Sequence, residues 1–190
     1  MAIFNKSLEV LLSWEGGYSF NPHDPGGETY CGISRRNHPD WIGWIEIDRI
    51  KDIRNGKPIL WNETYISLVP AVNVFYLNIY WNKESYSLIN NQDIADKIFQ
   101  HHVNMGIRAI YFAQVTLMHK IEKADGDLGP ITAKAINEST PETNIPRTSF
   151  LDQYIIILEQ YYEDLIREHT HLKVFEHEWL LRAKTIGKRP

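Results

Sequence analysis

Cysteine is almost absent from this chain of 190 residues, in which Cys31 is the only one. A single cysteine excludes an internal disulfide, and with it the small secreted scaffolds that depend on several disulfide bonds. It fits a reducing compartment without requiring one. Cys31 also leaves open a thiol-dependent amidase or peptidase, in which His23 or His38 would act as the base. A small buried cysteine is the more common alternative.

Long apolar runs are also missing. No segment approaches the ~20 apolar residues that a membrane-spanning helix needs. Residues 1–7 do not combine a basic region, an apolar run and a cleavage site, as a secretory leader does. We therefore expect no membrane insertion, and synthesis in the cytoplasm without a signal peptide. A role at the cell wall would then require release through a pore, cell lysis or an unconventional export route.

An excess of basic charge is missing as well. The 20 Lys and Arg residues are outnumbered by 24 Asp and Glu residues, which gives a formal net charge of −4. Nucleic-acid-binding proteins normally show a basic excess or stripe, so we expect no nucleic-acid partner. An anionic polymer would have to bind through a local basic patch, for which Arg35, Arg36 and His38 are the candidates. The sequence gives no indication of the oligomeric state.

Apolar and aromatic residues are plentiful. Hydrophobic residues make up 43% of the chain, enough for one domain or for two small units that share a core. The six Trp, ten Tyr and seven Phe exceed what a core of this size usually requires. Most of them are expected to pack inside the protein, but exposed rings would also suit a polysaccharide, because sugar rings stack on aromatic side chains.

Helical periodicity dominates the chain and predicts a mainly α fold. The first helix begins near Phe4 and ends at Glu15, because Gly16 and Gly17 favour a helix end. Residues 16–60 are expected to be mostly loop, with a small hairpin, a short helix in the stretch 37–44 and a turn within 45–60. Further helices are expected within 62–69, 70–81, 93–105, 108–123, 130–136 and 150–169, and around 175–183. Asn62 and Asp93 are the predicted caps of two of them.

Two carboxylates and a hydroxyl stand close together in the first loop. Glu15 and Asp24 are nine positions apart, and Thr29 follows them. The helix dipole and shielding by Trp14 and Tyr18 would both favour a protonated Glu15, whereas Asp24 in a polar turn should stay ionised. When two carboxyl groups have such different environments, one can act as general acid and the other as general base in cleaving a glycosidic bond. The alternative is a solvated helix end and an ordinary Asp turn.

Three segments resemble a known family: EGGYSFNPHDPGGETYCGIS at 15–34, DGDLGPIT at 125–132 and FEHEWLLR at 175–182. The first is similar to the N-terminal motif of glycoside hydrolase family 108. These are N-acetylmuramidases, often of phage or prophage origin, and some members carry the label of secretion activator. The second segment resembles the signature of the small peptidoglycan-binding-like domain that follows in this family, and the third resembles the closing motif of the family.

The resemblance implies a lysozyme-like helical fold with an active site at a loop or short hairpin. Residues 1–92 would form the catalytic region, and residues 93–190 a helical peptidoglycan-binding-like region packed as one compact unit with it. The catalytic glutamate would be Glu15, with Asp24 and Thr29 positioning the attacking water. The partner would be a peptidoglycan glycan strand, and no metal or organic cofactor would be needed. The expected substrate contacts are Tyr18, Tyr30, Arg35 and Trp41.

Two positions depart from the family pattern. Gln100 stands where an Asp often follows the Phe of the central helix, and Glu178 stands where the closing motif usually has Gly. Gln100 could still form hydrogen bonds but could not carry charge. Besides the muramidase and the Cys31 hydrolase, a third hypothesis therefore stays open. It is a non-catalytic protein on the same fold that binds the cell wall or assists secretion.

Overall fold

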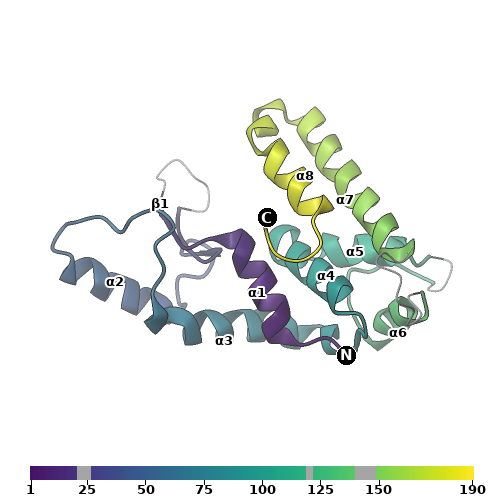
Figure 1. Cartoon of the computed structure of the whole chain (residues 1–190), viewed down its shortest axis with the longest axis horizontal. Coiled ribbons are helices and arrows are strands. Elements are labelled where there is room, and N and C mark those ends of the chain that lie inside the picture. The colour runs from purple at the N-terminus through teal and green to yellow at the C-terminus, as the bar shows by residue number, and fades with distance from the viewer. Residues whose placement is uncertain (21–26, 119–121, 140–148) are drawn as a thin grey trace. The chain divides into compact units, whose positions relative to one another are not determined.

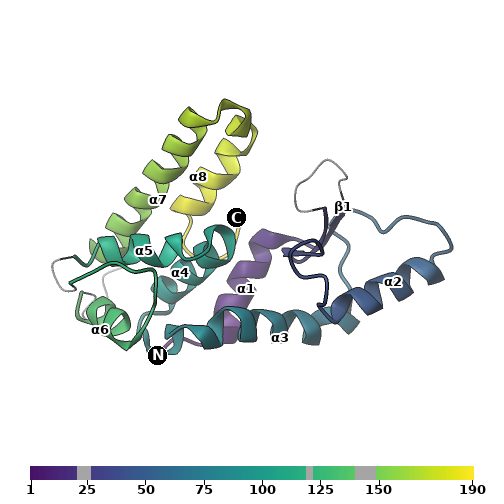
Figure 2. The same cartoon turned by 180° about the vertical axis from the view of Figure 1, so that it is seen from behind.

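The computed structural model describes residues 1–20, 27–118, 122–139 and 149–190, and within them the chain is mainly helical (Figures 1 and 2). The predicted class, mainly α with a short hairpin region, is confirmed. The chain divides into two compact units. We call Leu12–Ile79 the sheet unit, and Met1–Leu11 together with Tyr80–Pro190 the helical unit. No helix in the described residues is both long enough and apolar enough to span a membrane.

A small antiparallel sheet forms the centre of the sheet unit. Its strands are β1 (Tyr18–Phe20), β2 (Glu28–Tyr30) and β3 (Ile33–Ser34), paired in that order. Cys31 and Gly32 form the two-residue turn between β2 and β3, with φ angles of 48° and 80°. Positive φ at both turn positions is the geometry of the tightest hairpin turns, because its twist matches that of the strands.

Strand register separates the side chains onto two faces of the sheet. Thr29 pairs with Ser19 on β1 and with Ser34 on β3, so these three short polar residues share one face. Tyr18 pairs with Tyr30, and Phe20 pairs with Glu28, on the opposite face. The rest of the sheet unit is helical, with α1 (Phe4–Glu15, of which Leu12–Glu15 belong here), α2 (Gly43–Ile53), η1 (Ile66–Leu68) and α3 (Val69–Ile79).

The helical unit is built around α4 (Gln92–Met105), which is buried along most of its length. The side chain of Asn91 caps its start by accepting a hydrogen bond from the backbone of Ile94, in place of the predicted cap Asp93. Gly106, with φ of 70°, ends it. Around it lie α5 (Arg108–Val115), α6 (Pro130–Ser139), α7 (Ser149–Glu168) and α8 (Glu176–Lys184), with short 3-10 segments at Trp81–Lys83, Tyr86–Leu88 and Thr170–Phe175. Helices α7 and α8 pack side by side (Figures 1 and 2).

Aromatic packing explains where the helical unit begins. Trp81 contacts Phe4, Tyr86 and Phe99 with ring centroids 5.1–5.5 Å apart. This cluster joins the start of α1 to the segment after Ile79 and to α4. The division therefore falls at Tyr80, earlier than the predicted boundary after residue 92, and the first 11 residues belong with the C-terminal part.

Two predicted helices differ in extent. Asn62 does not cap a helix over 62–69, because its φ of 64° places it in a turn, and the α-helix begins only at Val69. The helix predicted over 108–123 ends at Val115. Near these places the chain makes contacts that the local pattern does not reveal: Asn62 accepts a hydrogen bond from the backbone N–H of Gly17, and Gln114 donates one to the hydroxyl of Thr132.

Candidate active site

Glu15 ends α1, and its carboxylate faces the turn between β2 and β3. A methyl group built on Gly32 would lie 2.7 Å from Oε2 of Glu15 and 2.8 Å from the hydroxyl of Tyr76. Any other residue at position 32 would therefore displace one of these two groups. Glycine is also favoured there by the left-handed φ of 80°. Gly32 thus lets a carboxylate and a phenol approach the same point of the backbone.

Tyr76 fixes this turn from α3. Its side chain is 1% exposed, and its hydroxyl donates a hydrogen bond of 2.7 Å to the carbonyl oxygen of Cys31. Cys31 itself is buried, and burial is the main reason why the pKa of its thiol rises to about 11, with the nearby Glu15 carboxylate adding to the rise. A thiol with this pKa is almost entirely protonated at neutral pH, which disfavours a cysteine nucleophile.

The neighbouring residues Asn62 and Glu63 explain why glycine is needed at both positions after Glu15. The backbone N–H of Gly17 donates to the side-chain oxygen of Asn62 at 2.6 Å. A methyl group on Gly17 would lie 2.6 Å from the carbonyl oxygens of both Asn62 and Glu63, and one on Gly16 would lie 2.8 Å from the Asn62 side chain. Residues 62 and 63 also pair through their backbones with Tyr18. The chain leaving α1 is thereby held in place immediately after Glu15.

Thr29 is half-buried on the polar face of the sheet, two residues before the Cys31–Gly32 turn. The structure therefore joins the strand that carries Thr29 to the turn that faces Glu15. Asp24, the second predicted carboxylate, lies outside the described residues. Its role, like that of Thr29, stays a prediction.

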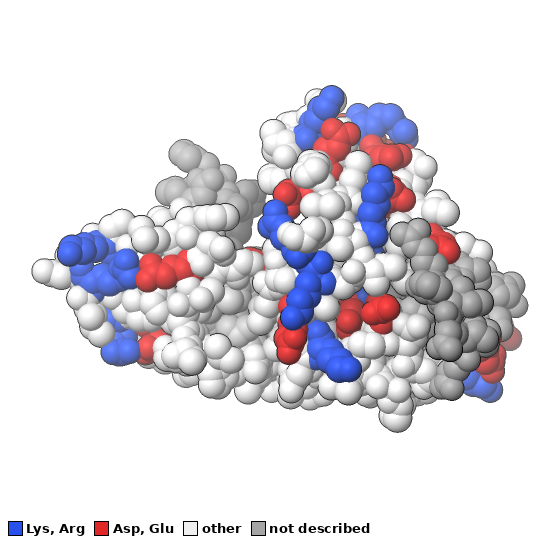
Figure 3. Space-filling model, viewed as in Figure 1, with Lys and Arg blue, Asp and Glu red and all other residues white. Residues whose placement is uncertain are grey.

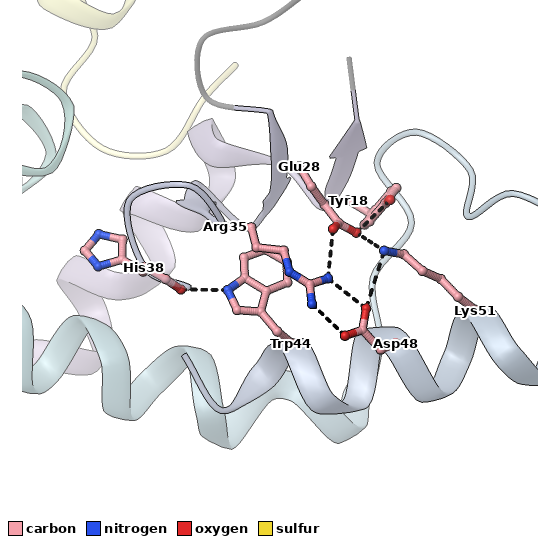
Figure 4. A network of polar contacts seen from close by, with 7 residues as sticks. All are labelled: Tyr18, Glu28, Arg35, His38, Trp44, Asp48 and Lys51. Atoms are coloured by element: carbon pink, nitrogen blue, oxygen red, sulfur yellow. Dashed lines mark hydrogen bonds and ion pairs between the residues drawn. The ribbon is translucent and has the colours of Figure 1, made fainter. Parts of the chain in front are cut away.

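A network of charges ties β2 to α2 (Figure 4). The Glu28 carboxylate accepts hydrogen bonds from Arg35 at 3.0 Å and from Tyr18 at 2.9 Å, and it forms an ion pair with Lys51. Arg35 also binds both carboxylate oxygens of Asp48, at 2.7 and 2.6 Å. Burial alone would raise the pKa of Glu28, but Lys51, Arg35 and Tyr18 outweigh it and hold that pKa below its ordinary value. Glu28 is thus a fixed anion suited to holding the strand rather than to donating a proton.

The side chains predicted to bind substrate take part mainly in packing. Tyr30 and Trp41 are 2% and 8% exposed, and their rings stack with centroids 6.1 Å apart. Tyr18 is buried with its hydroxyl on Glu28, and burial raises its pKa. Arg35 lies over the Trp44 ring at 5.3 Å and is engaged by two carboxylates. This geometry does not favour direct contacts of these residues with a sugar, and that assignment stays a prediction.

Other residues of the site were not foreseen. Tyr76 reads as one of several aromatic residues on a helix, and Glu28 as part of a turn-rich loop. Only the spacing of Glu28 and Arg35 around a tight hairpin would have suggested their pairing. Within the described residues, no group of three or more His, Cys, Asp and Glu side chains is placed to hold a metal ion.

These features define a small, mainly helical protein that presents the carboxyl group of Glu15 at a hairpin turn. The sequence profile described as glycosyl hydrolase 108 matches residues 8–106, which include Glu15, Thr29, Gly32 and Tyr76. The chain therefore belongs to this family.

A solved structure shows the same fold. The SagA protein of Brucella abortus is similar with a TM-score of 0.60 and 18% sequence identity, over 95% of this chain and 88% of its own. The likeness thus extends through both compact units. No curated protein matches the sequence significantly.

Proposed function

We propose that the protein is an N-acetylmuramidase, which cleaves peptidoglycan between N-acetylmuramic acid and N-acetylglucosamine. The observation that carries the proposal is the position of Glu15. It stands at the end of α1, half-buried, and faces a turn whose Gly32 admits the carboxylate by lacking a side chain. The family membership supports a glycoside hydrolase. The assignment of peptidoglycan as the substrate is the more specific part of the proposal.

In this mechanism Glu15 is the general acid. Its proton passes to the glycosidic oxygen as the bond from that oxygen to the anomeric carbon breaks, and the sugar takes on oxocarbenium character. A water molecule then supplies the hydroxyl at the anomeric carbon. Asp24 accepts the proton of this water, and Thr29 helps to hold it. Tyr76 and Gly32 do not react but position the turn against which Glu15 rests.

The test is digestion of purified, insoluble peptidoglycan, followed by borohydride reduction and mass analysis of the soluble products. Wild type should release fragments with new reducible muramic acid ends, and Glu15→Gln should release none while unfolding at the same temperature. Glu9→Gln is the matched control, because Glu9 lies exposed on the same helix in a surface ion pair with Lys188. It should retain wild-type activity.

The other outcomes separate the alternatives. Free peptides in place of muramic acid ends would identify an amidase or peptidase. No soluble product from folded wild type, together with its sedimentation on peptidoglycan, would replace the enzyme by a protein that binds the wall or assists secretion. The proposal also places the site of action at the cell wall, reached from the cytoplasm by release or export.

A further inference from the structure

A cavity lies on the sheet unit beside β1 and β2. It has a volume of about 410 Å³ and is bordered by β1, β2, the end of α2 and the segment 56–61. The side chains relevant here are Tyr18, Phe20, Glu28, Lys51, Lys57 and Trp61. Glu15 and Thr29 do not line it. The cavity is large enough to take part of a sugar ring with its substituents.

The strand register separates this cavity from the predicted catalytic face. Tyr18, Phe20 and Glu28 share the face of the sheet that is opposite to Thr29. A ligand in the cavity would therefore lie on the reverse side of β2 from the hydroxyl assigned to the attacking water. Among the described residues, the cavity thus shares no catalytic side chain with the muramidase site proposed above.

Two aromatic rings at the cavity are unusually exposed. The side chain of Trp61 is 80% exposed and that of Phe20 is 61% exposed, although the other Trp and Phe residues of this unit are buried. Exposed rings next to a cavity mark a binding surface more often than isolated apolar residues do. Their flat faces suit the C–H face of a pyranose ring.

The charges around the cavity favour an anionic group. Glu28 is already neutralised by Arg35 and Lys51, and Lys51 also lies 3.6 Å from Asp48. Lys57 is exposed at the cavity, and no carboxylate of the described residues pairs with it. Lys and Arg side chains lie over α2 and the segment that follows it, with Asp and Glu side chains among them (Figure 3). One ammonium group is thus available for a ligand carboxylate.

We propose that this cavity binds a second length of peptidoglycan, remote from the bond that is cut. A sugar ring stacks on the indole of Trp61, and a carboxylate of the attached stem peptide pairs with Lys57. The inference rests on the proposed function, because it takes the same polymer as ligand. Such a site would hold the enzyme on an insoluble wall between successive cuts.

The test uses the full chain carrying Glu15→Gln, so that the probe is not hydrolysed. The probe is a soluble disaccharide tripeptide from peptidoglycan, titrated while the indole N–H signals of the protein are followed by NMR. Trp61 is assigned by its absence in Trp61→Ala. Its signal should shift on titration, and the Kd read from that signal should weaken about tenfold in Lys57→Ala.

Two controls make the result specific. Leu60→Ala removes an exposed apolar side chain next to Trp61 that does not line the cavity, and it should leave the Kd unchanged. Chitotetraose, which has no carboxylate, should bind more weakly and with equal affinity to the parent and to Lys57→Ala. Equal loss of affinity for chitotetraose and the disaccharide tripeptide in Lys57→Ala would overturn the role of charge.

The inference and the proposed function can fail separately. A Trp61 signal that does not move, in a protein whose wild type cuts peptidoglycan, would overturn this site alone. A Trp61 signal that shifts in a chain without hydrolytic activity would keep the binding site and overturn the enzyme.

Discussion

Replacement of Gly32 by alanine tests whether the turn between β2 and β3 positions Glu15. The new methyl carbon would lie 2.7 Å from Oε2 of Glu15 and 2.8 Å from the hydroxyl of Tyr76, and both distances are too short for unbonded atoms. Because Tyr76 is buried and holds the carbonyl oxygen of Cys31, the half-buried Glu15 side chain should be the group that moves.

Gly32→Ala should lower both the folding stability and the hydrolysis rate. Alanine at a φ of +80° costs about 1–3 kcal/mol of folding free energy. Displacement of the acid by ~1 Å should lower the hydrolysis rate by ~100-fold, since proton donation depends on its position. The activity loss should therefore exceed what the loss of folded protein explains at 25 °C.

Gly187→Ala is the matched control. Gly187 has a φ of +86°, and a methyl group there meets nothing within 4 Å. It carries the backbone cost without the collision. Urea unfolding measures the stability of both variants, and release of soluble muropeptides measures their activity. If Gly32→Ala hydrolysed peptidoglycan as fast as Gly187→Ala, the assigned role of the turn would be refuted.

Three further predictions follow from buried groups. Lys97 is 2% exposed and donates to the carbonyl oxygens of Arg182 and Thr185, and burial lowers its pKa to about 7. The unfolded chain then binds more protons between pH 7 and about 10.4, so stability should rise with pH by a few kcal/mol over that range. Urea unfolding of Lys97→Met should show a smaller rise, and an equal one would contradict the assignment. Cys31→Ser should keep muramidase activity, and a thiol reagent at pH 7 should label native protein much more slowly than unfolded protein. Glu28→Gln should lower the melting temperature above pH 5, and this difference should shrink as acid protonates Glu28, because its lowered pKa stabilises the fold only while it is ionised. A melting difference that is independent of pH would show that the charge of Glu28 is unimportant.

Local signals in the sequence located the end of α1 correctly. An apolar helical face followed by Gly16 and Gly17 predicts a helix that stops at Glu15, and the structure agrees. The reason why Gly17 must be glycine was not predictable, since it depends on the backbone of Asn62 and Glu63, 45 residues and more along the chain. The sequence instead assigned Asn62 to a helix cap, a role that fits its residue type but not its place in the fold.

The partners of charged side chains and the exposure of individual tryptophans could not be predicted from the sequence either. Arg35 reads as a basic patch because sequence shows charges without their partners, and its contacts with Glu28 and Asp48 appear only when the hairpin meets α2. Trp41 and Trp61 are the same residue type, and the sequence alone does not distinguish their exposure. One is 8% exposed and the other 80%, a difference set by packing against Tyr30 and Phe75.

The close approach of backbone around Glu15 also has a consequence for how this gene tolerates change. Glycine has no smaller substitute, so every missense mutation at the codons of Gly17 and Gly32 adds atoms where none fit. Loss of Glu15 itself removes a proton donor, and smaller substitutes add no atoms there. In a saturation-mutagenesis library sorted only for soluble, folded protein, Gly17 and Gly32 should be depleted of variants while Glu15 is not. Homologues that have lost hydrolytic activity should therefore lack Glu15 more often than they lack Gly17 or Gly32.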